Sequence, residues 1–71
     1  MTEQISADMS ANVWKVLVSQ GDSVEPDQPL MILESMKMEI PVLSEDGGVV
    51  QRLHVAEGES VAPGHLLVEI Q

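Results

Sequence analysis

The stretch that decides the fold is Val13–Val24, which reads VWKVLVSQGDSV and returns 37 residues later as VQRLHVAEGESV over Val50–Val61. The correspondence continues downstream at matched prolines and leucines, namely Pro26 with Pro63 and Leu30 with Leu67. Glycine, valine, proline and leucine fix turns and cores, so their repetition indicates a duplicated structural unit. We therefore expect one domain over residues 1–71, built from two similar halves at about 5–36 and 42–71.

Each half opens with the same irregular strand pattern. In the first half, Val13, Val16 and Val18 are spaced by three residues and then by two, whereas a regular strand alternates every second residue. The second half repeats this spacing with Val50, Leu53 and Val55. A single break in alternation is typical of a strand that carries a β-bulge.

Two turns follow in each half. The dipeptides that supply them are Gly21-Asp22 and Gly58-Glu59 for the first turn, then Pro26-Asp27 and Pro63-Gly64 for the second. Proline presets φ at the first corner of such a turn. The position shared by Asp27 and Gly64 suits positive φ, which Asp tolerates and Gly prefers. Short apolar strands are expected next, at Leu30–Leu33 and Leu66–Ile70.

The sequence shows no pattern typical of a helix. No stretch keeps a helical period over the ~11 residues that a helix needs, and β-branched residues dominate. The sequence therefore predicts an all-β fold, a flattened barrel or sandwich of two small antiparallel sheets with about eight short strands and a pseudo-two-fold repeat. The first few residues are expected to be frayed.

Size and composition exclude several classes of protein. The chain has 71 residues, no cysteine and one aromatic side chain, Trp14. Its folded surface is expected to be about 4,300 Å², and its core is just large enough to offset the loss of chain entropy. A deep substrate cavity would hollow out that core, so an enzyme with its own buried active site is not expected. Without cysteine there is no disulfide scaffold and no Cys-based zinc or redox site.

Charge and hydropathy restrict the partners. Three basic residues against 12 acidic ones give a net charge of -9, which opposes binding to nucleic acid or anionic lipid and favours partners with positive surfaces. No apolar run approaches the ~20 residues that span a bilayer, and no secretory signal opens the chain. We expect a cytoplasmic protein, monomeric in isolation, that binds neither nucleic acid nor membrane.

One segment breaks the local rules. Strand-like residues flank Glu34-Ser35-Met36-Lys37-Met38-Glu39, so a hairpin should turn near Met36-Lys37. Two-residue hairpin turns favour Asn-Gly, Asp-Gly or a leading Gly, and Met-Lys fits poorly. A lone lysine is usually a solvated side chain, and methionine pairs usually fill core gaps. Two methionines at a hairpin tip cannot both bury well in so small a core, however, and failures of local propensity tend to mark function. Lys37 is therefore the candidate functional residue.

Other polar residues carry no recognisable chemistry. His54 and His65 lie in different halves without a carboxylate at metal-ligand spacing, so structural or solvent-facing roles are expected. Gly47-Gly48 is followed by neither Lys-Ser/Thr nor a helix, which excludes a phosphate-binding loop. Glu57 and Glu59 are expected to be solvated turn carboxylates. No nucleophile elbow occurs, so we expect no catalytic residues.

The hairpin segment and the repeat together carry a resemblance. Met36-Lys37-Met38, preceded by Glu34 and Ser35, resembles the Ala-Met-Lys-Met signature of biotin carrier domains in the biotinyl/lipoyl family, with Ser35 where alanine is usual. The two halves are similar to that family's duplicated framework, and the resemblance covers about residues 5–71. The chain looks most like the small stand-alone biotin/lipoyl attachment proteins.

The resemblance implies a function. Lys37 would carry covalent biotin, attached by a biotin protein ligase, and the biotin arm would shuttle activated CO₂ between biotin carboxylase and carboxyltransferase sites. The residues implied in recognition by the ligase and other partners are Met36, Met38, Glu34, Ser35 and Glu39. Lipoyl domains resemble this framework too, but theirs is typically Asp-Lys-Ala, so methionine on both sides of Lys37 favours biotin. Lipoate on Lys37, and an unmodified interaction module, are the alternatives.

Overall fold

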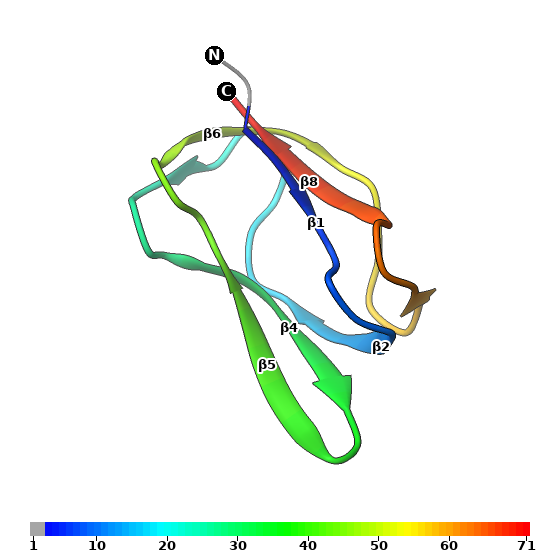
Figure 1. Ribbon diagram of the computed structural model, residues 1–71. Helices are drawn as coiled ribbons and strands as arrows, with labels where there is room; N and C mark the ends of the chain where they lie inside the picture. The colour runs from blue at the N-terminus through cyan, green and yellow to red at the C-terminus, as the bar shows by residue number, and fades with distance from the viewer. Residues whose placement is uncertain (1–2) are drawn as a thin grey trace.

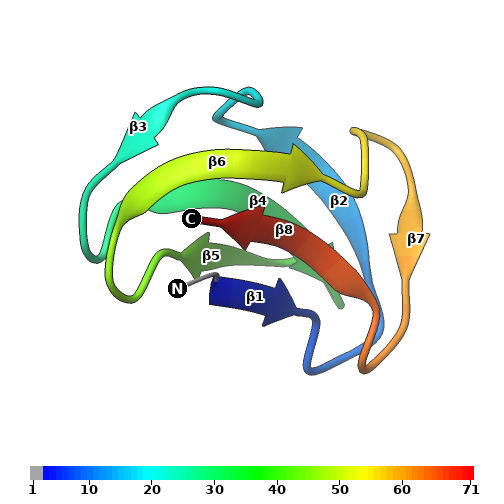
Figure 2. The ribbon, with the colours of Figure 1, turned by 90° about the horizontal axis from the view of Figure 1, so that it is seen from above.

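Eight antiparallel strands and no helix make up the computed structural model, which describes residues 3–71 (Figure 1). The strands are β1 (Glu3–Ser6), β2 (Ala11–Val16), β3 (Ser23–Val24), β4 (Pro29–Ser35), β5 (Met38–Leu43), β6 (Gly48–Leu53), β7 (Ser60–Val61) and β8 (Leu66–Ile70). They form two four-stranded sheets, in the orders β1-β8-β6-β3 and β5-β4-β2-β7. Figure 2 shows β6, β8 and β1 side by side in one layer, with β4 and β5 behind them. The predicted all-β architecture is confirmed.

The predicted strand irregularity is a β-bulge in each half. The β2–β4 pairing shifts register between Val13 and Lys15, and the β6–β8 pairing shifts between Val50 and Arg52. The additional residues are Trp14 and Gln51, which lie 37 positions apart. Each bulge keeps inward side chains on both of its sides. Val13 and Val50 before it are 1% exposed, and Val16 and Leu53 after it pack against the core.

The turns also match between the halves and tie the sheets together. Asp27 and Gly64 both have positive φ, 65° and 87°, as their shared position predicts. The Asp27 amide donates to the Ser44 carbonyl oxygen at 2.7 Å, and the Gly64 amide donates to that of Ala7 at 2.7 Å. These reciprocal hydrogen bonds join each half to a segment of the other.

The core lies between the two sheets. Its largest fully buried side chains are contributed by strands of both sheets: Leu30, Met31, Leu67, Ile70, Val13, Val50 and Val68. The accessible surface is 4456 Å², close to the value expected for the chain length. The molecule measures 32 × 18 × 17 Å. The β4–β5 hairpin forms one end of its long direction, and the start of β1 lies beside the end of β8 at the other end (Figure 1).

The N-terminal segment is paired as a strand from residue 3 onward. Glu3–Ser6 forms β1, and Glu3 pairs with Ile70 of β8. The main-chain groups of this segment find their partners in β8. Residues 1–2 lie outside the described part of the chain.

Candidate functional site

The β4–β5 hairpin closes through a two-residue turn made of Met36 and Lys37. Ser35 and Met38 are the last paired residues on either side. Met36 has φ of 52° and Lys37 has φ of 65°, so both central residues adopt the left-handed conformation of a type I′ turn. A side chain with a Cβ atom is disfavoured there by about 1 kcal/mol or more per residue. The backbone of the tip is therefore strained at two successive positions.

The side chains of this turn project into solvent. Met36 is 92% exposed and Met38 is 62% exposed, whereas Met31 of the core is fully buried. Lys37, between the two exposed methionines, is exposed as well. The methionine pair therefore does not fill a core gap, and the tip presents an amine with an apolar side chain on each side.

Acidic residues stand directly behind the tip. Glu34 of β4 pairs with Glu39 of β5, and both are exposed. Like charges opposite one another destabilise a strand pair. Within residues 3–71 the structure records an ion pair between His54 and Glu69. It records none between Lys37 and Glu34 or Glu39, so neither glutamate fixes the Lys37 amine. The amine is free to leave the surface of the domain.

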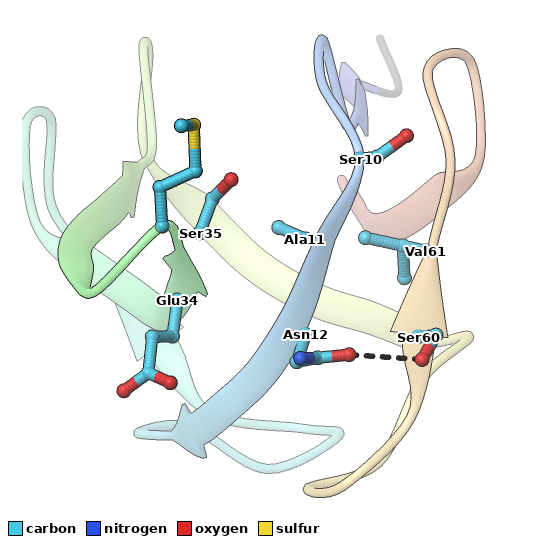
Figure 3. Close-up of a pocket in the computed structure, with 8 residues that line it drawn as sticks. Ser10, Ala11, Asn12, Glu34, Ser35, Ser60 and Val61 are labelled. Carbon is cyan, nitrogen blue, oxygen red and sulfur yellow. Dashed lines mark hydrogen bonds between the residues drawn. The ribbon is translucent and has the colours of Figure 1, made fainter.

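Beside the hairpin lies an open polar hollow of about 340 Å³ (Figure 3). Its lining comes from the start of β2, the end of β4 and β7: Ser10, Ala11, Asn12, Glu34, Ser35, Met36, Ser60 and Val61. In it the Ser60 hydroxyl donates to Asn12 Oδ1 at 2.8 Å. The hollow is open to solvent, and the core residues Ala11 and Val61 form part of its lining.

Pairing between β2 and β7 brings Asn12 and Ser60 to this place, 48 residues apart in the chain. Sequence reasoning found Glu34 and Ser35 from their place beside Lys37. It missed Asn12 and Ser60, because nothing near them in the sequence signals that β7 lies against β2. The site is thus the hairpin predicted from the sequence plus a polar margin that only the fold assembles.

The remaining polar candidates lie elsewhere. His54 Nε2 is 2.7 Å from Glu69 Oε1, and this hydrogen bond holds the pKa of the Glu69 carboxyl below its ordinary value of 4.5. His65 is exposed, and Glu57 accepts a hydrogen bond from the Val16 amide at 3.0 Å. No group of His, Asp or Glu side chains within residues 3–71 could hold a metal ion. None of the residues that the structure describes forms a helix that could cross a membrane.

Comparison with known proteins gives the geometry a context. A family model described as "Biotin-requiring enzyme" matches residues 2–70. The chain is 44% identical over 66 residues to the biotin/lipoyl attachment protein of Bacillus subtilis, covering 93% of this chain and 90% of that protein. It is 45% identical over 64 residues to the biotin carboxyl carrier protein of Streptococcus mutans, covering 90% of this chain and 49% of that protein.

Solved structures share the fold. The urea carboxylase of Kluyveromyces lactis matches with a TM-score of 0.92 and 28% identity, over 100% of this chain and 6% of that one. The lipoyl domain of the 2-oxoglutarate dehydrogenase complex of Azotobacter vinelandii matches with a TM-score of 0.83 and 26% identity, over 96% and 94% of the two chains. The same architecture thus occurs inside a large carboxylase and as a separate domain.

Proposed function

Because the chain belongs to the biotin/lipoyl family, we propose that it is a biotin carrier in which Lys37 is the residue that receives the cofactor. The observation that carries the proposal is the tip itself. Lys37 stands exposed on a strained two-residue turn, between two exposed methionines. A fold that gained nothing from these residues would favour Asn-Gly at this turn.

Attachment requires the amine to act as a nucleophile. In the proposed reaction the Lys37 nitrogen attacks the acyl carbonyl of biotinyl-adenylate held by a biotin protein ligase, an amide forms and AMP leaves. Only the neutral amine can attack, and a lysine in water is almost wholly protonated at neutral pH. The ligase therefore supplies the base, and this domain supplies the position of the amine.

The loaded domain would serve carboxylase chemistry. Biotin on Lys37 would supply a ureido nitrogen able to carry CO₂ between a biotin carboxylase site and a carboxyltransferase site. The chain's own part is to present Lys37 beyond a rigid body and keep it near both sites, which raises its effective concentration there. Met36 and Met38 would give both enzymes soft apolar contacts. The net charge of -9 would steer the domain toward basic docking surfaces.

The setting of this function is part of the proposal. The domain acts as an accessory to a biotin-dependent carboxylase or transcarboxylase and catalyses no step itself. We place it in the cytoplasm, as a monomer between its visits to partner enzymes. Its negative charge opposes self-association. Ser35 and Glu39, next to the exposed tip, are assigned to partner recognition with Glu34 and the two methionines.

The experiment that tests the attachment site uses both lysines of the chain. Purified wild-type protein is incubated with biotin protein ligase, biotin and ATP, and is followed by intact mass and avidin blot. We expect one biotin per chain in wild type and in Lys15→Arg, and none in Lys37→Arg or Lys37→Ala. The Lys37 variants should unfold at the wild-type temperature, because the side chain is exposed. Labelling of Lys37→Arg would show that the site is wrong.

The same measurement separates the alternatives. Protein isolated from its own host is expected to carry the mass of a biotinyl group. The mass of a lipoyl group would establish the lipoyl carrier, and an unmodified mass together with failure of labelling in vitro would establish an interaction module.

A further inference from the structure

Four apolar side chains share the outer face of the sheet that carries the hairpin. Trp14 is 43% exposed and Leu17 is 51% exposed, while Ile32 is half-buried and Pro41 is exposed. Ile32 of β4 pairs with Pro41 of β5 on one side and with Lys15 of β2 on the other. Their inward neighbours, Val13 and Leu33 among them, are in the core. We call Trp14, Leu17, Ile32 and Pro41 the apolar face.

The duplicated framework supplies an internal control for this face in the other sheet. The offset of 37 residues maps its members onto polar residues of the other sheet: Trp14 onto Gln51, Leu17 onto His54, Ile32 onto Glu69 and Pro41 onto Gln4. The registers agree, because Glu69 pairs with Gln4 on one side and with Arg52 on the other. The same strand positions of the same framework are thus built once with apolar and once with polar side chains.

The polar side chains at the equivalent positions have partners on their own sheet. On the apolar face, Trp14 has the Lys15 Nζ 5.6 Å from its ring centroid, yet both Trp14 and Leu17 stay exposed to solvent. Glu69 is hydrogen-bonded to His54 on the surface of its own sheet, and its strand neighbour there is Gln4. That set shows that the framework folds without apolar residues at these positions. Trp14 and Leu17 expose about half of their area on the equivalent surface. Large apolar side chains that folding does not need, and that water contacts, mark a binding surface.

We propose that the apolar face is the surface by which the biotin protein ligase holds this domain while it modifies Lys37. This inference rests on the proposed function. A lysine nitrogen reaches only about 6 Å from its own Cα atom, so the enzyme that forms a bond to it must come close to the domain. The Ile32–Pro41 pair is three register positions behind Ser35–Met38, or about 10 Å along the strands. A ligase bound at the tip therefore also extends over the apolar face.

Interface size and charge agree with that occupant. A stable interface buries about 800 Å² on each partner, which the side chains of a two-residue turn cannot supply without an adjoining surface. Glu34 and Glu39 lie between the apolar face and the tip, and the whole chain carries a charge of -9. The complementary surface is thus an apolar pocket for Trp14 with an acceptor for the adjacent Lys15 ammonium, and with basic side chains on the side that meets Glu34 and Glu39. A second copy of this chain fits poorly, because like charges repel.

The test replaces the apolar face with residues that the other half already uses. Trp14→Gln copies Gln51, and the double variant Leu17→His/Ile32→Glu copies the hydrogen-bonded pair of His54 and Glu69. Val49→Gln is the matched control, since Val49 is an apolar residue 44% exposed on the other sheet. For each protein, KM and kcat of ligation are measured with purified biotin protein ligase, and the unfolding midpoint is measured in parallel.

We expect Trp14→Gln and the double variant each to raise KM for the apo-protein by about tenfold or more, as loss of a tryptophan contact at an interface does. Their kcat should stay within twofold of wild type and their unfolding midpoints should stay near it, while Val49→Gln behaves as wild type. Wild-type KM in both face variants would overturn the proposal. So would a concentration-dependent dimer of the wild type, detected by sedimentation, that Trp14→Gln abolishes.

The two proposals fail in different ways. If wild-type protein is never labelled on Lys37, the proposed function is wrong. If wild-type protein is labelled and the face variants are labelled equally well, only the docking surface is wrong. Should Ile32→Glu unfold the double variant, Leu17→His alone serves in its place, because Leu17 is 51% exposed, and an unchanged KM in it and in Trp14→Gln counts against the face.

Discussion

The turns of the body and the turn at the hairpin tip treat positive φ in opposite ways. In the body, the matched positions at φ of 65° and 87° hold Asp27 and Gly64, which are residue types that accept this conformation. At the tip, φ of 52° and 65° falls on Met36 and Lys37, which do not. The tip also sets Glu34 opposite Glu39. The body follows the requirements of folding, and the tip holds residues that folding disfavours, so their role is sought outside the fold.

The largest expected effect belongs to the body, at Gly48. A Cβ atom there would lie 2.4 Å from the Gln71 carbonyl oxygen, which is backbone, and φ is 138°. Gly48→Ala should lower the free energy of unfolding by about 3 kcal/mol, or the melting temperature by more than about 10 °C. Gly58→Ala is the control, because it meets no atom within 4 Å and should lose only about 1 kcal/mol. Equal losses would mean that the close approach to Gln71 does not limit position 48.

Substitutions at the tip should raise the free energy of unfolding, whereas the substitution at Gly48 lowers it. Met36→Asn/Lys37→Gly installs a favoured type I′ turn, so the free energy of unfolding should rise by about 1 to 2 kcal/mol. The gain is read from urea unfolding, and biotin labelling should disappear with Lys37. A loss of stability would show that the tip is not strained and would remove the contrast with the body.

A smaller effect is expected at Asp27, whose φ is 65°. Asp27→Gly should leave the free energy of unfolding within about 0.5 kcal/mol of wild type, because relief of φ is offset by the greater freedom of the unfolded chain. Asp27→Ala should lose about 1 kcal/mol. Both values come from thermal unfolding. If alanine proves equal to glycine, position 27 is no better matched to its backbone than the tip is.

The smallest expected effect is a pH dependence that belongs to the body. The hydrogen bond with His54 lowers the pKa of Glu69 in the folded state below 4.5. Its contribution to stability is therefore present above the unfolded-state pKa and is lost as pH falls through the lowered folded-state value. Glu69→Gln should flatten the decline of the melting temperature below pH 4.5, while Glu39→Gln, close to the tip, is the exposed control. An unchanged decline in Glu69→Gln would mean that the pair with His54 does not contribute.

Much of the body could be predicted because its signals are local. The spacing of Val13, Val16 and Val18 predicts the bulge, and the shared position of Asp27 and Gly64 predicts positive φ. The exposure of Met36 and Met38 was predicted from the size of the core. Each of these features depends on residues a few positions apart, where turn chemistry and alternation act directly.

The remainder depends on which strands meet. The hydrogen bond between Asn12 and Ser60 spans 48 residues, and the pair of His54 and Glu69 spans 15. No turn residue or spacing encodes these contacts, since they follow from the pairing of β2 with β7 and of β6 with β8. The apolar face was missed for the same reason. Trp14 of β2 and Pro41 of β5 come to lie on one surface only because both strands pair with β4.

The pairing of Glu3 with Ile70 has a consequence for how such a domain can be combined with others. The start of β1 and the end of β8 therefore lie side by side, at the end of the 32 Å long direction that lies away from the hairpin (Figure 1). A host protein could therefore accept the unit at either end, or within an internal loop, through one narrow neck. Such a junction would leave the working end unobstructed, and the length of the neck would set the volume that this end can sweep.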